Sequence, residues 1–142
     1  MNITILYPHK RKTKSSTYGI AQMVLDRLLS GGTLHEFYLP QDMPHVCTGC
    51  YACMNGREDK CGGHEYMQKL IAAMDDSELI VFCAPTYVYH IPGQVKTLLD
   101  HFGYRWLVHR PDLSLMRKQA LIITTAAGGG LKGRGHDKHR PG

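Results

Sequence analysis

Residues 3–28, ITILYPHKRKTKSSTYGIAQMVLDRL, decide how the first part of this chain folds. The run from Ile3 to Tyr7 is apolar and rich in β-branched residues, which predicts a strand covered on both faces. A basic, hydroxyl-rich loop follows, and Ser15, Ser16 and Thr17 are side-chain types that begin helices. Apolar residues then recur at helical spacing. The segment therefore predicts a strand, a polar loop and a helix in succession.

The same alternation continues along the chain. Further strand-like runs lie at residues 34–39, 79–84 and 120–125, and helical patterns lie at 67–74 and 95–102. Alternating strands and helices predict right-handed crossovers and an α/β fold with a doubly wound parallel sheet. Such sheets usually have a fifth strand and a last helix, which this sequence lacks. The fourth strand is therefore expected at an exposed edge.

Composition is typical of one folded domain, expected at residues 1–130 and followed by a polar, basic and disordered tail at 131–142. Neither a membrane-spanning run nor a signal peptide is present, so we expect a cytoplasmic protein with no membrane partner and reduced cysteines. The formal net charge of +5 is concentrated at residues 10–14 and 132–140, which suits an anionic ligand. No nucleic-acid partner is expected, because no aromatic platform alternates with these basic residues.

The most specific motif is a cysteine cluster with the spacing C-x2-C-x2-C-x7-C, formed by Cys47, Cys50, Cys53 and Cys61. Three cysteines at this spacing in a tight turn are typical of a [4Fe–4S] cluster, although the fourth spacing differs from that of bacterial ferredoxins. Zinc bound by the same sulfurs and a metal-free, redox-active loop are the alternatives. Cys83 ends an apolar run and is expected in the core.

The loop at residues 8–17 joins a strand to a helix, which favours a phosphate site. Backbone N–H groups, the helix dipole and the hydroxyls of Ser15, Ser16 and Thr17 would hold the phosphate. The glycines of the dinucleotide fingerprint and of the Walker A loop are absent. Neither ATP nor NAD as a fixed cofactor is therefore indicated.

Residues 84–94, APTYVYHIPGQ, follow the third strand and lead into a helix. Tyr87 and Tyr89 could flank a flat ring such as isoalloxazine, and packing of both tyrosines on the protein is the alternative. Among the histidines, His90 is the candidate proton donor to a reduced flavin, because it lies in this loop.

Together these motifs resemble the NAD(P)H-dependent FMN reductase and iron–sulfur flavoprotein group of the flavodoxin-like superfamily, over residues 1–130. The first strand with its helix start, the cysteine cluster, residues 84–100 and residues 124–129 carry the resemblance. The sequence departs from the family at Tyr7-Pro8-His9, where glycine, serine and proline are usual. The resemblance implies a flavodoxin-like fold without the fifth strand and last helix.

The resemblance also implies the cofactors and the residues that bind them. The FMN phosphate would be bound by Ser15, Ser16 and Thr17. The ribityl chain and the ring would be bound by Pro85, Thr86, Tyr87 and Val88. The edge of the ring would be contacted by Ala126, Ala127 and Gly128. The four cysteines of the cluster would ligate a [4Fe–4S] centre that exchanges electrons with FMN. No side chain is identified as catalytic, because the cofactor carries the chemistry.

The expected function is an FMN-dependent oxidoreductase. Electrons would pass from NADH or NADPH through FMN, with or without a [4Fe–4S] cluster, to a small-molecule acceptor or a redox protein. The resemblance further implies a homo-oligomer. The alternatives are an electron carrier with no substrate site of its own and a zinc-stabilised binding module.

Overall fold

A computed structural model of the chain describes residues 1–10, 14–106 and 112–127. The strands predicted from the sequence are all present, within one or two residues of their expected positions, and so are the helices. The elements in chain order are β1 (Ile3–Tyr7), α1 (Ser16–Leu28), β2 (Leu34–Tyr38), α2 (Leu39–Asp42), the 3-10 helix η1 (Glu58–Lys60), α3 (His64–Asp76), β3 (Leu79–Cys83), α4 (Gly93–Trp106), the 3-10 helix η2 (Leu113–Arg117) and β4 (Gln119–Ile123).

The strands form one parallel sheet in the order β2-β1-β3-β4. β1 is central, and Ile3 lies opposite Leu34 of β2 and Leu79 of β3. Strand order reverses between β1 and β3, because the chain leaves β1 toward one edge of the sheet and returns to its other side. The predicted doubly wound α/β architecture is confirmed.

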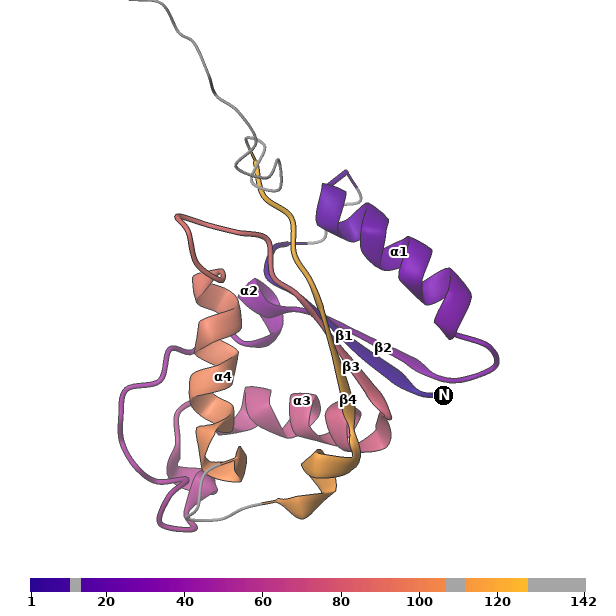
Figure 1. Ribbon diagram of the computed structural model, residues 1–142. Helices are drawn as coiled ribbons and strands as arrows, with labels where there is room; N and C mark the ends of the chain where they lie inside the picture. Colours follow the sequence, from indigo (N-terminus) through magenta and orange to yellow (C-terminus); the bar gives the residue numbers. More distant parts are fainter. Residues whose placement is uncertain (11–13, 107–111, 128–142) are drawn as a thin grey trace, which may run out of the picture.

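Helices cover both faces of the sheet, α1 on one and α2, α3 and α4 on the other (Figure 1). Side chains of β1 alternate between these faces, so that Ile3 and Ile5 pack against Ala21 and Leu25 of α1. On the opposite face, buried residues of the sheet meet α2, α3 and α4. The core on that face contains Leu6, Leu39, Met43, Met67, Leu70, Met74, Ile80, Val95, Leu98 and Phe102.

Two details differ from the sequence prediction. The strand predicted at residues 34–39 ends at Tyr38, and the short helix α2, which was not predicted, follows it; the N–H of Tyr38, the residue before α2, donates to the Asp42 carboxylate at 2.6 Å. The nearly continuous apolar run at residues 120–125 is typical of a strand covered on both faces, yet Ile122 of β4 is 66% exposed. β4 is the last strand of the described sheet. The exposed edge that was also expected for this strand is present.

The predicted tail at residues 131–142 lies outside the described residues. Within the described ranges, none of the helices combines the length and the apolar character needed to cross a membrane.

Candidate functional site

A cavity of about 320 Å³ opens at the carboxyl edge of the sheet. It lies beside the β1–β3 reversal, where doubly wound sheets bind their ligands. Three separate segments line it: the β1–α1 loop, the β3–α4 loop and the end of β4. The lining residues are His9, Ser15, Ser16, Thr17, Pro85, Thr86, Tyr87, Thr125, Ala126 and Ala127. We call this cavity the carboxyl-edge cavity.

The start of α1 supplies hydrogen-bond donors to this cavity. Ser15 is the N-cap, and its Oγ accepts a hydrogen bond from the Tyr18 N–H at 3.1 Å. None of the described residues accepts a hydrogen bond from the backbone N–H of Ser16 or Thr17, as is usual for the first turn of a helix. With the positive end of the helix dipole, these donors suit a phosphate group.

Hydrogen bonds join the end of β4 to the other two segments. The hydroxyls of Thr17 and Thr125 lie 2.8 Å apart, although 108 positions separate them in the chain. The Thr86 N–H donates to the Thr125 carbonyl at 2.7 Å, which extends the β3–β4 ladder beyond the strands. Ala126 and Ala127, which the resemblance assigns to the edge of the flavin ring, then line the cavity. Gly128, also predicted at this site, lies outside the described residues.

The β3–α4 loop contains a tight turn at the mouth of the cavity. Tyr87 and His90 exchange two backbone hydrogen bonds of 2.9 and 3.0 Å, and Val88 and Tyr89 between them have φ angles of 46° and 62°. Positive φ at both central residues is the geometry of a type I′ hairpin turn, which favours Asn and Gly. A β-branched residue in this conformation is strained, and such strain is concentrated at functional sites.

The turn separates the residues that were predicted to contact a flavin ring. Tyr87 lines the cavity, whereas Val88 and Tyr89 are 93% and 98% exposed and are not among the lining residues. His90, the candidate proton donor, is also exposed and outside the lining. Contact of these three residues with a cofactor stays a prediction.

His9 lines the cavity, although it is not among the site residues predicted from the sequence. Its Nδ1 lies 2.8 Å from the Lys10 carbonyl oxygen and its Nε2 lies 3.2 Å from Ser15 Oγ. Its ring also packs against Tyr7, with 5.6 Å between ring centroids. One signal could have identified it: His9 lies two residues after the end of the first strand, where the chain departs from the family pattern.

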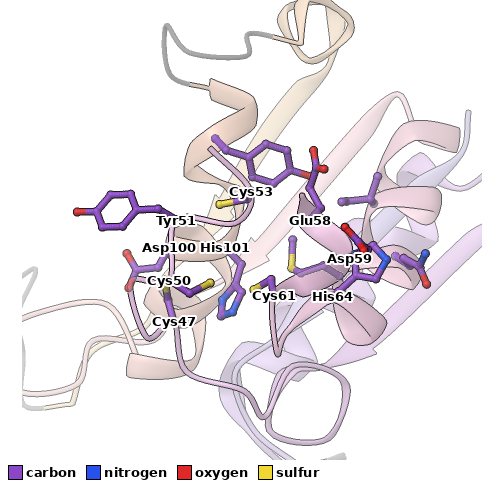
Figure 2. Close-up of a pocket in the computed structure, with 14 residues that line it drawn as sticks. Cys47, Cys50, Tyr51, Cys53, Glu58, Asp59, Cys61, His64, Asp100 and His101 are labelled. Carbon is purple, nitrogen blue, oxygen red and sulfur yellow. The ribbon is translucent and has the colours of Figure 1, made fainter. Parts of the chain in front are cut away.

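The four cysteines of the predicted cluster line a second pocket, of about 330 Å³, which we call the cysteine pocket (Figure 2). Cys47 and Cys50 are exposed, and Cys53 and Cys61 are partly buried. Asp100, His101 and Tyr104 of α4 complete its wall, together with residues of η1 and α3. Within the described part of the chain, no three His, Cys, Asp or Glu side chains are placed to hold a metal ion. The metal centre therefore stays a prediction.

Burial has the largest effect on the pKa of the Cys61 thiol. Partial burial raises its pKa, and the nearby sulfurs of Cys50 and Cys53 act in the same direction, whereas a hydrogen bond from the Gly63 N–H opposes the change. A metal ion would supply the positive charge needed to hold several thiolates together. Cys83 lies elsewhere, fully buried in β3, and burial raises the pKa of its thiol to about 12. The prediction that Cys83 is a core residue is confirmed.

A histidine pair supports the turn that carries Cys61. The buried His101 ring must donate from Nδ1 to the Thr97 carbonyl at 2.8 Å, so in the neutral ring Nε2 accepts from His45 Nδ1 at 3.3 Å. The backbone after Cys61 lies directly on this pair. A Cβ atom added to Gly62 would come within 2.5 Å of His45 Nε2, and one added to Gly63 within 2.6 Å of His101 Nε2.

The chain resembles known proteins in sequence and in fold. A model of the family described as NADPH-dependent FMN reductase matches residues 1–139. An FMN-dependent NADH:quinone oxidoreductase from Photorhabdus laumondii subsp. laumondii is 35% identical over 65 residues, which are 42% of this chain and 32% of that protein. An iron-sulfur flavoprotein from Archaeoglobus fulgidus is 35% identical over 54 residues, 38% of this chain and 25% of that one. The matched segments thus span a third or less of these two relatives.

A solved structure shows the same fold. An FMN-dependent NADH-azoreductase from Bacillus anthracis str. Ames Ancestor, in complex with FMN, superimposes with a TM-score of 0.67 at 15% identity. The likeness covers 90% of this chain and 70% of that one. The expected flavodoxin-like fold is confirmed.

Gly63→Ala tests the support beneath the cysteine pocket. Because His101 is buried and hydrogen-bonded, it cannot move aside freely, and we expect the free energy of unfolding to fall by about 1–3 kcal/mol. Gly19→Ala is the matched control: a Cβ there meets nothing within 4 Å, and alanine in a helix should add about 0.5–1 kcal/mol. Urea denaturation measures both changes. Equal stability of the two variants would contradict the packing described.

Val88→Asn tests the strain in the turn. Asparagine tolerates positive φ, so we expect the free energy of unfolding to rise by about 1 kcal/mol. The control is Val46→Asn, since Val46 is also exposed but has no positive φ. Thermal and urea denaturation compare the variants. A stability gain at both positions, or at neither, would show that the turn stores no strain.

Proposed function

The chain belongs to the NADPH-dependent FMN reductase family, and from this membership we propose that it is an FMN-dependent oxidoreductase that passes electrons from NADH or NADPH to a small acceptor. The relative from Photorhabdus laumondii suggests a quinone as the class of acceptor. The carboxyl-edge cavity is the proposed site of FMN.

One observation carries the proposal. Residues assigned to FMN from three distant parts of the sequence line a single cavity, at the edge and the strand reversal where this architecture binds ligands. Eight of the assigned residues are among those that line it: Ser15, Ser16, Thr17, Pro85, Thr86, Tyr87, Ala126 and Ala127. If the loops were grouped by coincidence, the residues that line the cavity would not be expected to match the residues assigned to FMN so closely.

The donor groups suit the two ends of FMN. At one end, the free N–H groups of Ser16 and Thr17 and the hydroxyls around them match a phosphate dianion. At the other, Tyr87 is about half exposed at the cavity and offers an aromatic face beside the backbone of a strained turn. The cavity volume of about 320 Å³ is at the lower end of the range for small-ligand sites.

When bound, FMN would accept a hydride equivalent from the nicotinamide and deliver two electrons to the acceptor. The chain's own residues would bind the cofactor and orient it. The start of α1 would hold the phosphate end, the Thr17–Thr125 pair joins two walls of the cavity, and the β3–α4 turn positions an aromatic side chain at the cavity. No described side chain is required to form a covalent bond.

The finer proposal is that the cysteine pocket holds a [4Fe–4S] cluster. Four thiols share one pocket, and the similar protein from Archaeoglobus fulgidus is an iron-sulfur flavoprotein. α4 links the two sites: it begins after the β3–α4 loop and reaches the cysteine pocket at Asp100 and His101.

The first test is the full chain mixed with FMN. We expect bound flavin in the absorption spectrum and oxidation of NADH or NADPH when a benzoquinone is added. Flavin binding without nicotinamide oxidation would favour the electron-carrier alternative. A chain that binds no FMN would overturn the proposal.

Ser16→Glu separates the cofactor site from the fold. A carboxylate at the first residue of α1 stabilises the helix by about 0.3–1 kcal/mol but repels a phosphate. We expect at least a tenfold loss of FMN affinity, with no loss for riboflavin, which lacks the phosphate. Ser16→Gln, which has the same shape without the charge, is the control and should keep most of the FMN affinity. Fluorescence titration gives the dissociation constants, and unchanged FMN binding by Ser16→Glu would place the phosphate elsewhere.

Anaerobic reconstitution tests the cluster. With iron and sulfide we expect about four of each per chain. Cys50→Ala should lose most of this content, and the control Cys83→Ala should retain it, because Cys83 lies in the core away from the pocket. Iron, sulfide and zinc are assayed on the same samples. One zinc per chain without iron would replace this proposal with a structural zinc site.

A further inference from the structure

The hydrogen bonds around His9 fix which atoms carry protons. The Lys10 carbonyl oxygen can only accept, so His9 Nδ1, 2.8 Å away, must carry a proton and donate it. In a neutral ring the second nitrogen is then an acceptor. The Ser15 hydroxyl, 3.2 Å from Nε2, must therefore donate its proton to His9.

This arrangement uses the hydroxyl proton of Ser15 in the hydrogen bond to His9. Ser15 Oγ also accepts the Tyr18 N–H, which caps α1. While its proton is donated to His9 Nε2, the Ser15 hydroxyl has no donor for a ligand and offers the cavity only a lone pair. A phosphate, whose oxygens all accept, is poorly matched to that face.

Protonation of His9 reverses the direction of its hydrogen bond with Ser15. Both ring nitrogens of an imidazolium donate, so Nε2–H would donate to Ser15 Oγ and the Ser15 hydroxyl could turn its own proton into the cavity. The imidazolium would also add a positive charge to the cavity wall. Both changes favour a dianion.

We propose that His9 is a positioning residue of the carboxyl-edge cavity: a phosphate dianion binds together with one proton from solvent, which resides on His9 Nε2 and frees the Ser15 hydroxyl to donate to the ligand. This inference rests on the proposed FMN site and adds to it a residue and a proton. No bond is made or broken except the N–H bond formed on His9 and the bond that this proton leaves in water or buffer.

Other titratable groups near His9 do not supply the same proton. Those in the described residues are Tyr7, which packs on the ring, Tyr18 beside it, Tyr87 across the cavity, and Lys10 and Lys14 in the same loop. None of them is a histidine, the side chain whose charge ordinarily changes between pH 5 and 8. Burial raises the pKa of Tyr7, which keeps its phenol neutral.

The test compares FMN and riboflavin over pH 7–9, above the second ionisation of a phosphate at about pH 6. If a proton binds with the dianion, FMN affinity is highest where His9 is protonated and falls as pH rises, approaching tenfold per unit for one linked proton. Riboflavin affinity should not follow this slope. His9→Gln, whose amide N–H donates without a charge change, should bind FMN with no slope.

A matched control and a direct proton count make the test decisive. His35→Gln removes a histidine of β2 that lines neither pocket and should keep the slope. Calorimetry of wild-type FMN binding in two buffers of different ionisation enthalpy should show proton uptake near pH 8, and it needs no variant. FMN binding that is intact but free of proton uptake, or a slope kept by His9→Gln, overturns this inference alone. Absence of FMN binding at every pH overturns the proposed function as well.

Discussion

The central strand β1 is the constraint on which the rest of the structure depends. Its residues are fully buried, paired with β2 on one side and β3 on the other, so both neighbours are held in parallel register. Right-handed connections from this strand must place α1 on one face and the later helices on the other. The loops that leave β1 and β3 therefore diverge, and the space between them is the carboxyl-edge cavity.

Much of this could be predicted from local sequence. The strands and the helices of three or more turns follow from the spacing of apolar residues, and the cavity residues follow from the rule that parallel strands present their loops at one edge. The cysteine cluster was predicted from its spacing, and the structure places all four thiols in one pocket. Spacing alone does not give the distances between sulfurs, which depend on the loop's path and on any bound metal.

Other features depend on contacts that local patterns do not contain. The importance of His9 arises from two hydrogen bonds to its own loop and from a cavity completed by residues more than 70 positions away. The strained turn at Val88 was unexpected because valine disfavours positive φ, so propensity predicts the opposite conformation. β4 has an apolar sequence without cover on both faces, since its position in the sheet, and not its composition, decides its exposure.

The hydroxyl pair of Thr17 and Thr125 has a consequence for how the protein is made. It joins α1 to the segment that follows β4, across 108 positions of the chain. During synthesis the first strand and helix leave the ribosome early, but the wall formed by Thr125, Ala126 and Ala127 emerges only after all four strands of the described sheet have been translated. A cofactor can thus enter a finished cavity only after this wall has emerged, and its capture would then stabilise the completed fold over partly folded chains.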